Sequence, residues 1–90
     1  MSNYTKNNIP PDLIKAAELI SQDKLKKAEP ILRNYLNDDP LDVNAMKLLA
    51  DIGVKFRAYK DAGYLLTRAL DLAPDYDEAR LSYANLLYKR

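Results

Sequence analysis

The feature that most restricts the fold of this chain is an internal repeat with a spacing of 34 residues. Chemically matched pairs recur at this spacing: Leu25 and Tyr59, Ala28 and Ala62, Leu32 and Leu66, Leu36 and Leu70, and Pro40 and Pro74. Ala16, Ala50 and Ala84 form a triplet at the same spacing. A period of about 20 to 50 residues is typical of tandem arrays, in which each unit buries its apolar face against its neighbours.

Apolar residues follow the i, i+3, i+4, i+7 spacing of an amphipathic helix in five segments. These segments are residues 12–22, 24–37, 43–56, 59–72 and 77–90. The connections between them are only a few residues long, so successive helices are expected to pack antiparallel. The sequence therefore predicts an all-α fold.

Prolines and aspartates mark the expected helix ends. Pro40 and Pro74 follow the second and fourth segments, where a residue without an amide hydrogen ends a helix. Pro30 lies inside the second segment, and it predicts either a kinked helix or one whose regular part begins near Glu29. The candidate N-caps are Asp12, Asp42, and Asp75 or Asp77.

Composition excludes several classes of function. The 90 residues include 14 basic and 13 acidic side chains, a net charge of +1, which argues against a nucleic-acid-binding protein. The chain has no cysteine and no histidine, so it lacks thiolate ligands and the usual general base. The polar N-terminus is not a signal peptide, and no apolar run is long enough to span a membrane. We expect a cytoplasmic protein.

The 34-residue period, with small residues at Ala16, Ala50 and Ala84 and prolines at Pro40 and Pro74, resembles the tetratricopeptide repeat. The resemblance covers residues 9–90. It implies one domain, a right-handed α-solenoid of antiparallel helix pairs with about two and a half repeats. Repeat one is 9–42, repeat two is 43–76, and 77–90 is the first helix of repeat three; residues 1–8 are expected to form a polar, flexible tail. The sequence departs from the family at the usual first-helix tryptophan position, which Asp12, Met46 and Arg80 occupy, and at Tyr35, where alanine is common.

The resemblance implies a protein–protein interaction module that binds a polypeptide segment on its concave face. The matching concave positions are Leu13, Ala17, Ile20, Lys47, Asp51, Val54, Leu81, Asn85 and Tyr88. This mixed apolar and charged wall suits an extended or helical segment of another protein. The alternative interpretation is an ordinary solvent-facing surface on a curved scaffold.

Relatives that grip the C-terminal carboxylate of chaperones use a cluster of lysine, asparagine and arginine side chains. The matching positions here are Leu13, Ala17, Leu48, Glu78 and Ser82. None of them is a cation, so binding of a chaperone C-terminus is not expected.

No catalytic residue, cofactor or metal site is expected. The carboxylate pairs Asp38-Asp39 and Asp77-Glu78 lie beside helix ends, where they compensate the helix dipole. Residues 41–52, 61–66 and 68–74 resemble the amino-terminal repeats of bacterial tetratricopeptide-containing sulfotransferases. An accessory domain of such an enzyme, or a self-association or spacer unit, is therefore an alternative function.

The last segment is unusually apolar for the end of a solenoid, which normally has a polar outer face. Its large apolar residues are Leu81, Tyr83, Leu86, Leu87 and Tyr88. Either a longer array or a second copy would cover them. We favour an N-terminal fragment of a longer array, because Lys89 matches Lys55 at the repeat spacing.

Charges are expected to separate onto opposite edges of the array. Basic side chains at the turns within repeats are Lys24, Lys26, Lys27, Lys55, Arg57, Lys60, Lys89 and Arg90. Acidic side chains at the turns between repeats are Asp38, Asp39, Asp42, Asp71, Asp75, Asp77 and Glu78. Steering of a charged partner and simple solubility both stay open as explanations.

Overall fold

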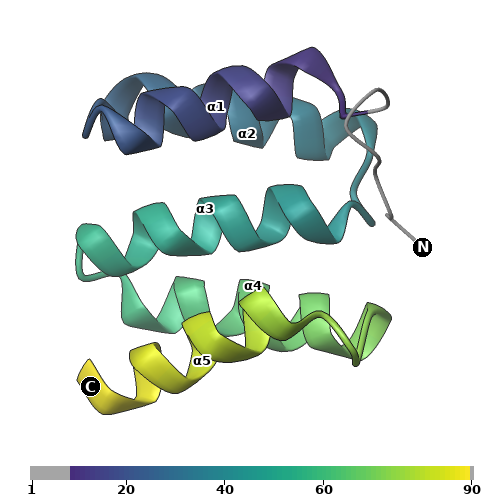
Figure 1. Cartoon of the computed structure of the whole chain (residues 1–90), viewed down its shortest axis with the longest axis vertical. Coiled ribbons are helices and arrows are strands. Elements are labelled where there is room, and N and C mark those ends of the chain that lie inside the picture. Colours follow the sequence, from purple (N-terminus) through teal and green to yellow (C-terminus); the bar gives the residue numbers. More distant parts are fainter. Residues whose placement is uncertain (1–8, 90) are drawn as a thin grey trace.

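A computed structural model of the chain describes residues 9–89, which form five α-helices joined by short turns (Figure 1). The helices are α1 (Pro11–Ser21), α2 (Leu25–Asp38), α3 (Val43–Lys55), α4 (Tyr59–Leu72) and α5 (Asp77–Lys89). The predicted all-α fold is confirmed for these residues. The expected tail at residues 1–8, and Arg90, lie outside the described residues.

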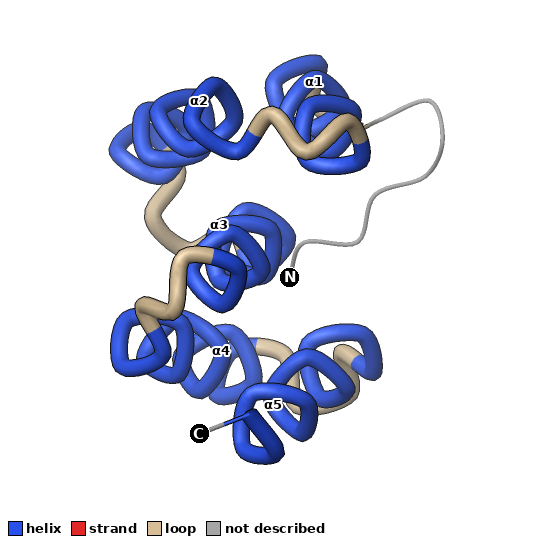
Figure 2. The backbone as a smooth tube through the Cα atoms, turned by 90° about the vertical axis from the view of Figure 1, so that its left-hand side faces the viewer, coloured by secondary structure: helices blue, strands red, loops and turns tan. Residues whose placement is uncertain are grey.

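The helices form two layers (Figure 2). Each helix packs against the next one along the chain, and α3 also contacts both α1 and α5. The first layer therefore contains α1, α3 and α5, and the second layer contains α2 and α4. Among the described helices, none combines the length and the apolar content that crossing a membrane requires.

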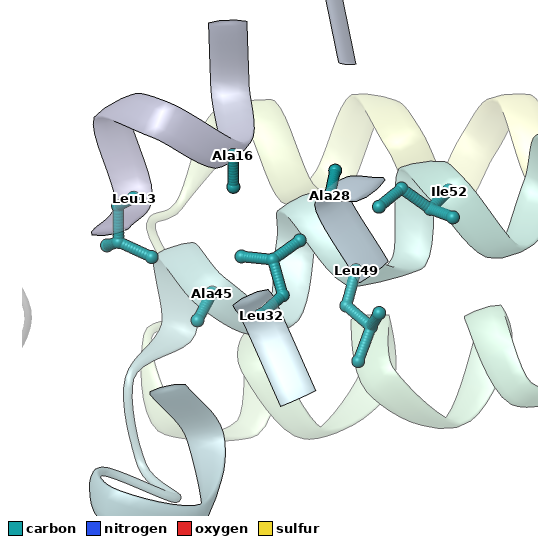
Figure 3. Close-up of a cluster of buried hydrophobic side chains, with 7 residues drawn as sticks. All are labelled: Leu13, Ala16, Ala28, Leu32, Ala45, Leu49 and Ile52. Carbon is teal, nitrogen blue, oxygen red and sulfur yellow. The ribbon is translucent and has the colours of Figure 1, made fainter. Parts of the chain in front are cut away.

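The first core cluster lies between α1, α2 and α3 (Figure 3). Its buried members are Leu13, Ala16, Ala28, Leu32, Ala45, Leu49 and Ile52. Small and large side chains alternate here, so the alanines bring the backbones close while Leu32, with no exposed surface, fills the space between them.

Two further clusters join α3 to the second half of the chain. One contains Ala50, Ala62, Leu66, Ala79 and Leu86, from α3, α4 and α5. The other contains Val43, Met46, Ala69 and Ala73. α3 contributes to all three clusters and is therefore the central helix of the molecule.

α3 and α4 approach each other closely at Gly53. A Cβ atom at this position would lie 3.4 Å from the Cβ of Ala62. Because that distance is at the lower limit of ordinary van der Waals contact, a larger side chain at either position would push the two helices apart. Ala62, the counterpart of Ala28 at the repeat spacing, is small enough to allow this close approach.

The turns inside the two helix pairs share one geometry. Asp23 and Arg57, which are 34 residues apart, adopt positive φ angles of 61° and 63°. In both turns the following amide donates to a carbonyl five residues earlier, with an N···O distance of 2.8 Å. This is the Schellman arrangement that ends a helix, here without the usual glycine. The sequence repeat is therefore also a repeat of backbone conformation.

Two details of the predicted helix ends are different in the structure. α2 runs without a break from Leu25 through Pro30, so the prediction that its regular part begins near Glu29 is wrong. Pro30 has no amide hydrogen to donate to the carbonyl four residues earlier. Because Pro30 is exposed, that carbonyl lies on the solvent side of the helix. Asp12 is not an N-cap, because α1 begins at Pro11 and Pro10 precedes it; Asp42 does cap α3.

Candidate binding groove

A groove of about 860 Å³ crosses the first layer of helices. Its lining residues from α1 and the segment before it are Ile9, Leu13, Ile14, Ala17 and Glu18. α3 contributes Val43, Asn44, Lys47 and Leu48. The α4–α5 turn and the start of α5 contribute Ala73, Asp75, Tyr76, Asp77 and Glu78. The floor is mostly apolar, and the charged side chains come from α1, α3, the α4–α5 turn and the start of α5.

Of the nine predicted concave residues, three line this groove: Leu13, Ala17 and Lys47. Leu13 is 3% exposed, so it supports the floor and offers little surface to a partner. Ala17 is exposed, and its small side chain leaves the groove open beside α1.

The other six predicted residues are outside the groove. Ile20 and Val54 pack against the first and second core clusters, so they are partly buried support. Asp51 is also partly buried. Leu81, Asn85 and Tyr88 are exposed on α5 away from the groove.

Asp51 connects two helices of the first layer. Its carboxylate forms an ion pair with Lys47, with an Nζ–Oδ2 distance of 2.7 Å, and accepts a hydrogen bond of 3.1 Å from the Ser82 hydroxyl. The first contact lies within α3 and the second joins α3 to α5. The Lys47 ammonium is therefore already paired with a carboxylate.

The α4–α5 turn supplies residues that helix positions alone did not indicate. Tyr76 stands 34 residues after Asp42 and lies directly before α5, as Asp42 lies directly before α3. Asp42 is fully buried, and its side chain accepts hydrogen bonds of 3.0 Å from the Ala45 amide and from the Tyr35 hydroxyl. Tyr76 instead contributes an aromatic ring that packs against two core clusters and lines the groove. Asp42 is thus not part of the acidic surface that the sequence predicted.

Tyr76 lines the groove and is partly buried there. The pKa of Tyr76 is raised from 10.0 to about 12, first by burial and then by neighbouring negative charge. The charges are those of Glu78, Asp51 and Asp42, in decreasing order of effect. Ionisation of the Tyr76 hydroxyl is therefore disfavoured.

This shift predicts a stability loss at alkaline pH. Below about pH 10 the Tyr76 hydroxyl is protonated in both the folded and the unfolded chain, so it adds no pH dependence. Between about pH 10 and pH 12 the unfolded chain loses this proton more readily, so the free energy of unfolding falls as pH rises.

Urea unfolding of the wild type and Tyr76→Phe at about pH 8 and about pH 11 measures this effect. The variant should lose less stability between the two pH values than the wild type, because its side chain does not ionise. Equal losses in the two proteins would show that Tyr76 does not cause the pH dependence.

The outer face of α5 is uncovered in the described part of the chain. Leu81 is 64% exposed and Tyr88 is 93% exposed. Ala84 is exposed, whereas Ala16 and Ala50, its counterparts at the repeat spacing, are fully buried. This difference arises because, among the described residues, no helix crosses α5 as α2 crosses α1.

Comparison of the chain with protein-family models, with curated proteins and with solved structures found no significant match.

Proposed function

We propose that the protein is a protein–protein interaction module, a tetratricopeptide-like scaffold of about two and a half repeats that binds a polypeptide segment in its groove. The observation that carries this proposal is the groove itself, which spans α1, α3 and the start of α5. Its volume of about 860 Å³ is in the range of sites that hold several side chains of a ligand. Rigid helices hold its walls, so little conformational entropy is lost when a partner binds.

The repeat of backbone geometry supports the scaffold part of the proposal. The two inner turns share their φ angles and hydrogen bonds, and the residues that end α2 and α4 have nearly equal torsions. These C-cap residues, Asp39 and Ala73, have φ, ψ of −134°, 77° and −137°, 81°. Such regularity is what a right-handed solenoid of antiparallel helix pairs requires.

Self-association through α5 is a second candidate, because the exposed Leu81, Leu87 and Tyr88 form an apolar surface on this helix. A second copy would bury these side chains. The variants described in the next paragraph separate this candidate from groove binding.

Panning of a phage library of random peptides against the full chain tests the groove. Ala17→Trp places a large side chain in the groove from an exposed position. Ala84→Trp is the matched control on α5, because Ala84 is also an exposed helical alanine but does not line the groove. Fluorescence anisotropy of selected peptides should show at least tenfold weaker binding to Ala17→Trp and unchanged binding to Ala84→Trp.

Peptides that bind Ala17→Trp as tightly as the wild type would contradict the groove proposal. Light scattering on the same samples reports self-association. A concentration-dependent dimer that only Ala84→Trp disrupts, together with no peptide binding, would favour the α5 candidate instead.

A further inference from the structure

Carboxylates line the groove on both sides of its central helix. Glu18 lies on α1, and Asp75, Asp77 and Glu78 lie at the α4–α5 turn and in the first turn of α5. All four residues are exposed, so their charges face water in the empty groove. α1 and α5 both contact α3 (Figure 2). A segment lying along the groove floor would therefore pass between these carboxylates.

Few cations compensate this charge. Lys47 is the one cation that lines the groove among residues 9–89, and Asp51 pairs with it at 2.7 Å. Arg80 lies 4.0 Å from Asp77, but both side chains are more than half exposed, so this pair is weak. Within the described chain Glu18, Asp75 and Glu78 form no ion pair.

Apolar surface lies beside these charges. Ile14 is 44% exposed and Ala17 is exposed, and both line the groove. Leu48 and Tyr76 are partly buried and line it as well. A ligand that fits this surface combines apolar side chains for the floor with positive charges for the carboxylates.

We propose that the groove selects a cationic segment of another polypeptide, in which lysine or arginine side chains alternate with apolar ones. This inference rests on the proposed function and names the chemical class of its partner. Glu78 and Asp75 repel a carboxylate, so acidic segments such as a free C-terminal tail are rejected. Nucleic acid is rejected for the same reason, since its phosphates are negative.

Three synthetic peptides test the selection. They share the same tyrosine and leucine positions and differ only at the intervening positions, which carry lysine, glutamine or glutamate. Fluorescence anisotropy with the full chain at low salt should rank them in the order lysine, glutamine, glutamate. The lysine peptide should bind at least tenfold more tightly than the glutamine peptide, and added salt should reduce this difference.

Charge reversal on the protein locates the selectivity. The double variant Glu18→Lys/Glu78→Lys should bind the lysine peptide about tenfold more weakly and reverse the preference toward the glutamate peptide. Asp61→Lys is the control, because Asp61 is an exposed carboxylate in the first turn of α4 and does not line the groove. It should leave the ranking of the three peptides unchanged.

The outcomes separate this inference from the proposed function. If the glutamine or glutamate peptide binds as tightly as the lysine peptide, the groove binds polypeptides but the inferred charge selection is wrong. If Asp61→Lys and the double variant weaken binding equally, the selection comes from net charge and not from the groove, which also overturns the inference. If none of the three peptides binds, and panning yields no groove ligand, the proposed function itself fails.

Discussion

Replacing Leu66 by alanine should lower the free energy of unfolding by about 2–5 kcal/mol. Leu66 has no exposed surface and lies in the second core cluster with Ala50, Ala62 and Ala79. Except for Leu86, the other buried members of this cluster are alanines, whose side chains cannot extend into the space that the removed atoms leave. A small domain has a total stability of about 5–15 kcal/mol, so the variant should be close to the limit of folding.

Chemical denaturation followed by circular dichroism measures this loss. Leu81→Ala is the matched control, because it removes the same atoms from a helical leucine that is 64% exposed. Its free energy of unfolding should change by less than about 0.5 kcal/mol. A similar loss in both variants would mean that the second core cluster does not hold α4 and α5 in place.

Asp42→Ala should destabilise the fold by about 2–4 kcal/mol. The Asp42 side chain is fully buried and caps α3, the central helix, by accepting a hydrogen bond from the Ala45 amide. It also accepts a hydrogen bond from the Tyr35 hydroxyl of α2. Alanine removes both acceptors from a site that water does not reach, and a buried donor without its acceptor is costly.

Asp42→Asn provides the comparison, because its side-chain oxygen can still accept from the Ala45 amide. Its loss should be clearly smaller than that of Asp42→Ala when both are measured by urea unfolding. A double-mutant cycle with Tyr35→Phe isolates the contact between α2 and α3. A loss below about 0.5 kcal/mol for Asp42→Ala would contradict the structural role of this side chain.

The two repeats place a tyrosine at different positions, Tyr35 in the first and Tyr76 in the second. The counterpart of Tyr35 at the 34-residue spacing is Ala69. Asp42 and Tyr76 are the second pair of counterparts. The connection from α2 to α3 therefore has its tyrosine, Tyr35, in helix α2. The connection from α4 to α5 has its tyrosine, Tyr76, in the turn. The departure from the repeat pattern was visible in the sequence, but the hydrogen bond that explains it joins residues of two different elements.

The groove was only partly predictable, for a related reason. The resemblance to the tetratricopeptide repeat implied nine concave residues, and three of them, Leu13, Ala17 and Lys47, line the groove. It did not indicate Asp75 and Tyr76, since the residues of a turn have no helical period. Their proximity to α1 depends on the way in which α5 packs against α3.

The number of helices, their bounds and their pairing follow from local features of the chain. Apolar spacing, prolines and short connections act over a few residues, and apart from Pro30, which lies inside α2, these features agree with one another from residue 9 to residue 89. The tight contacts at Ala16 and Ala50 also follow, because each of these residues is covered by a helix that comes next in the chain.

Exposure of individual side chains depends instead on neighbours that are distant in the sequence. Ala84 has the same chemistry and repeat position as Ala50, yet one is exposed and the other buried, because α4 covers α3 and no described helix covers α5 in that way. Likewise the carboxylates of Glu18 and Glu78 belong to one groove only because α1 and α5 lie on either side of α3. A local sequence pattern selects the helices, but packing between helices sets which surfaces remain free and which charges share a site.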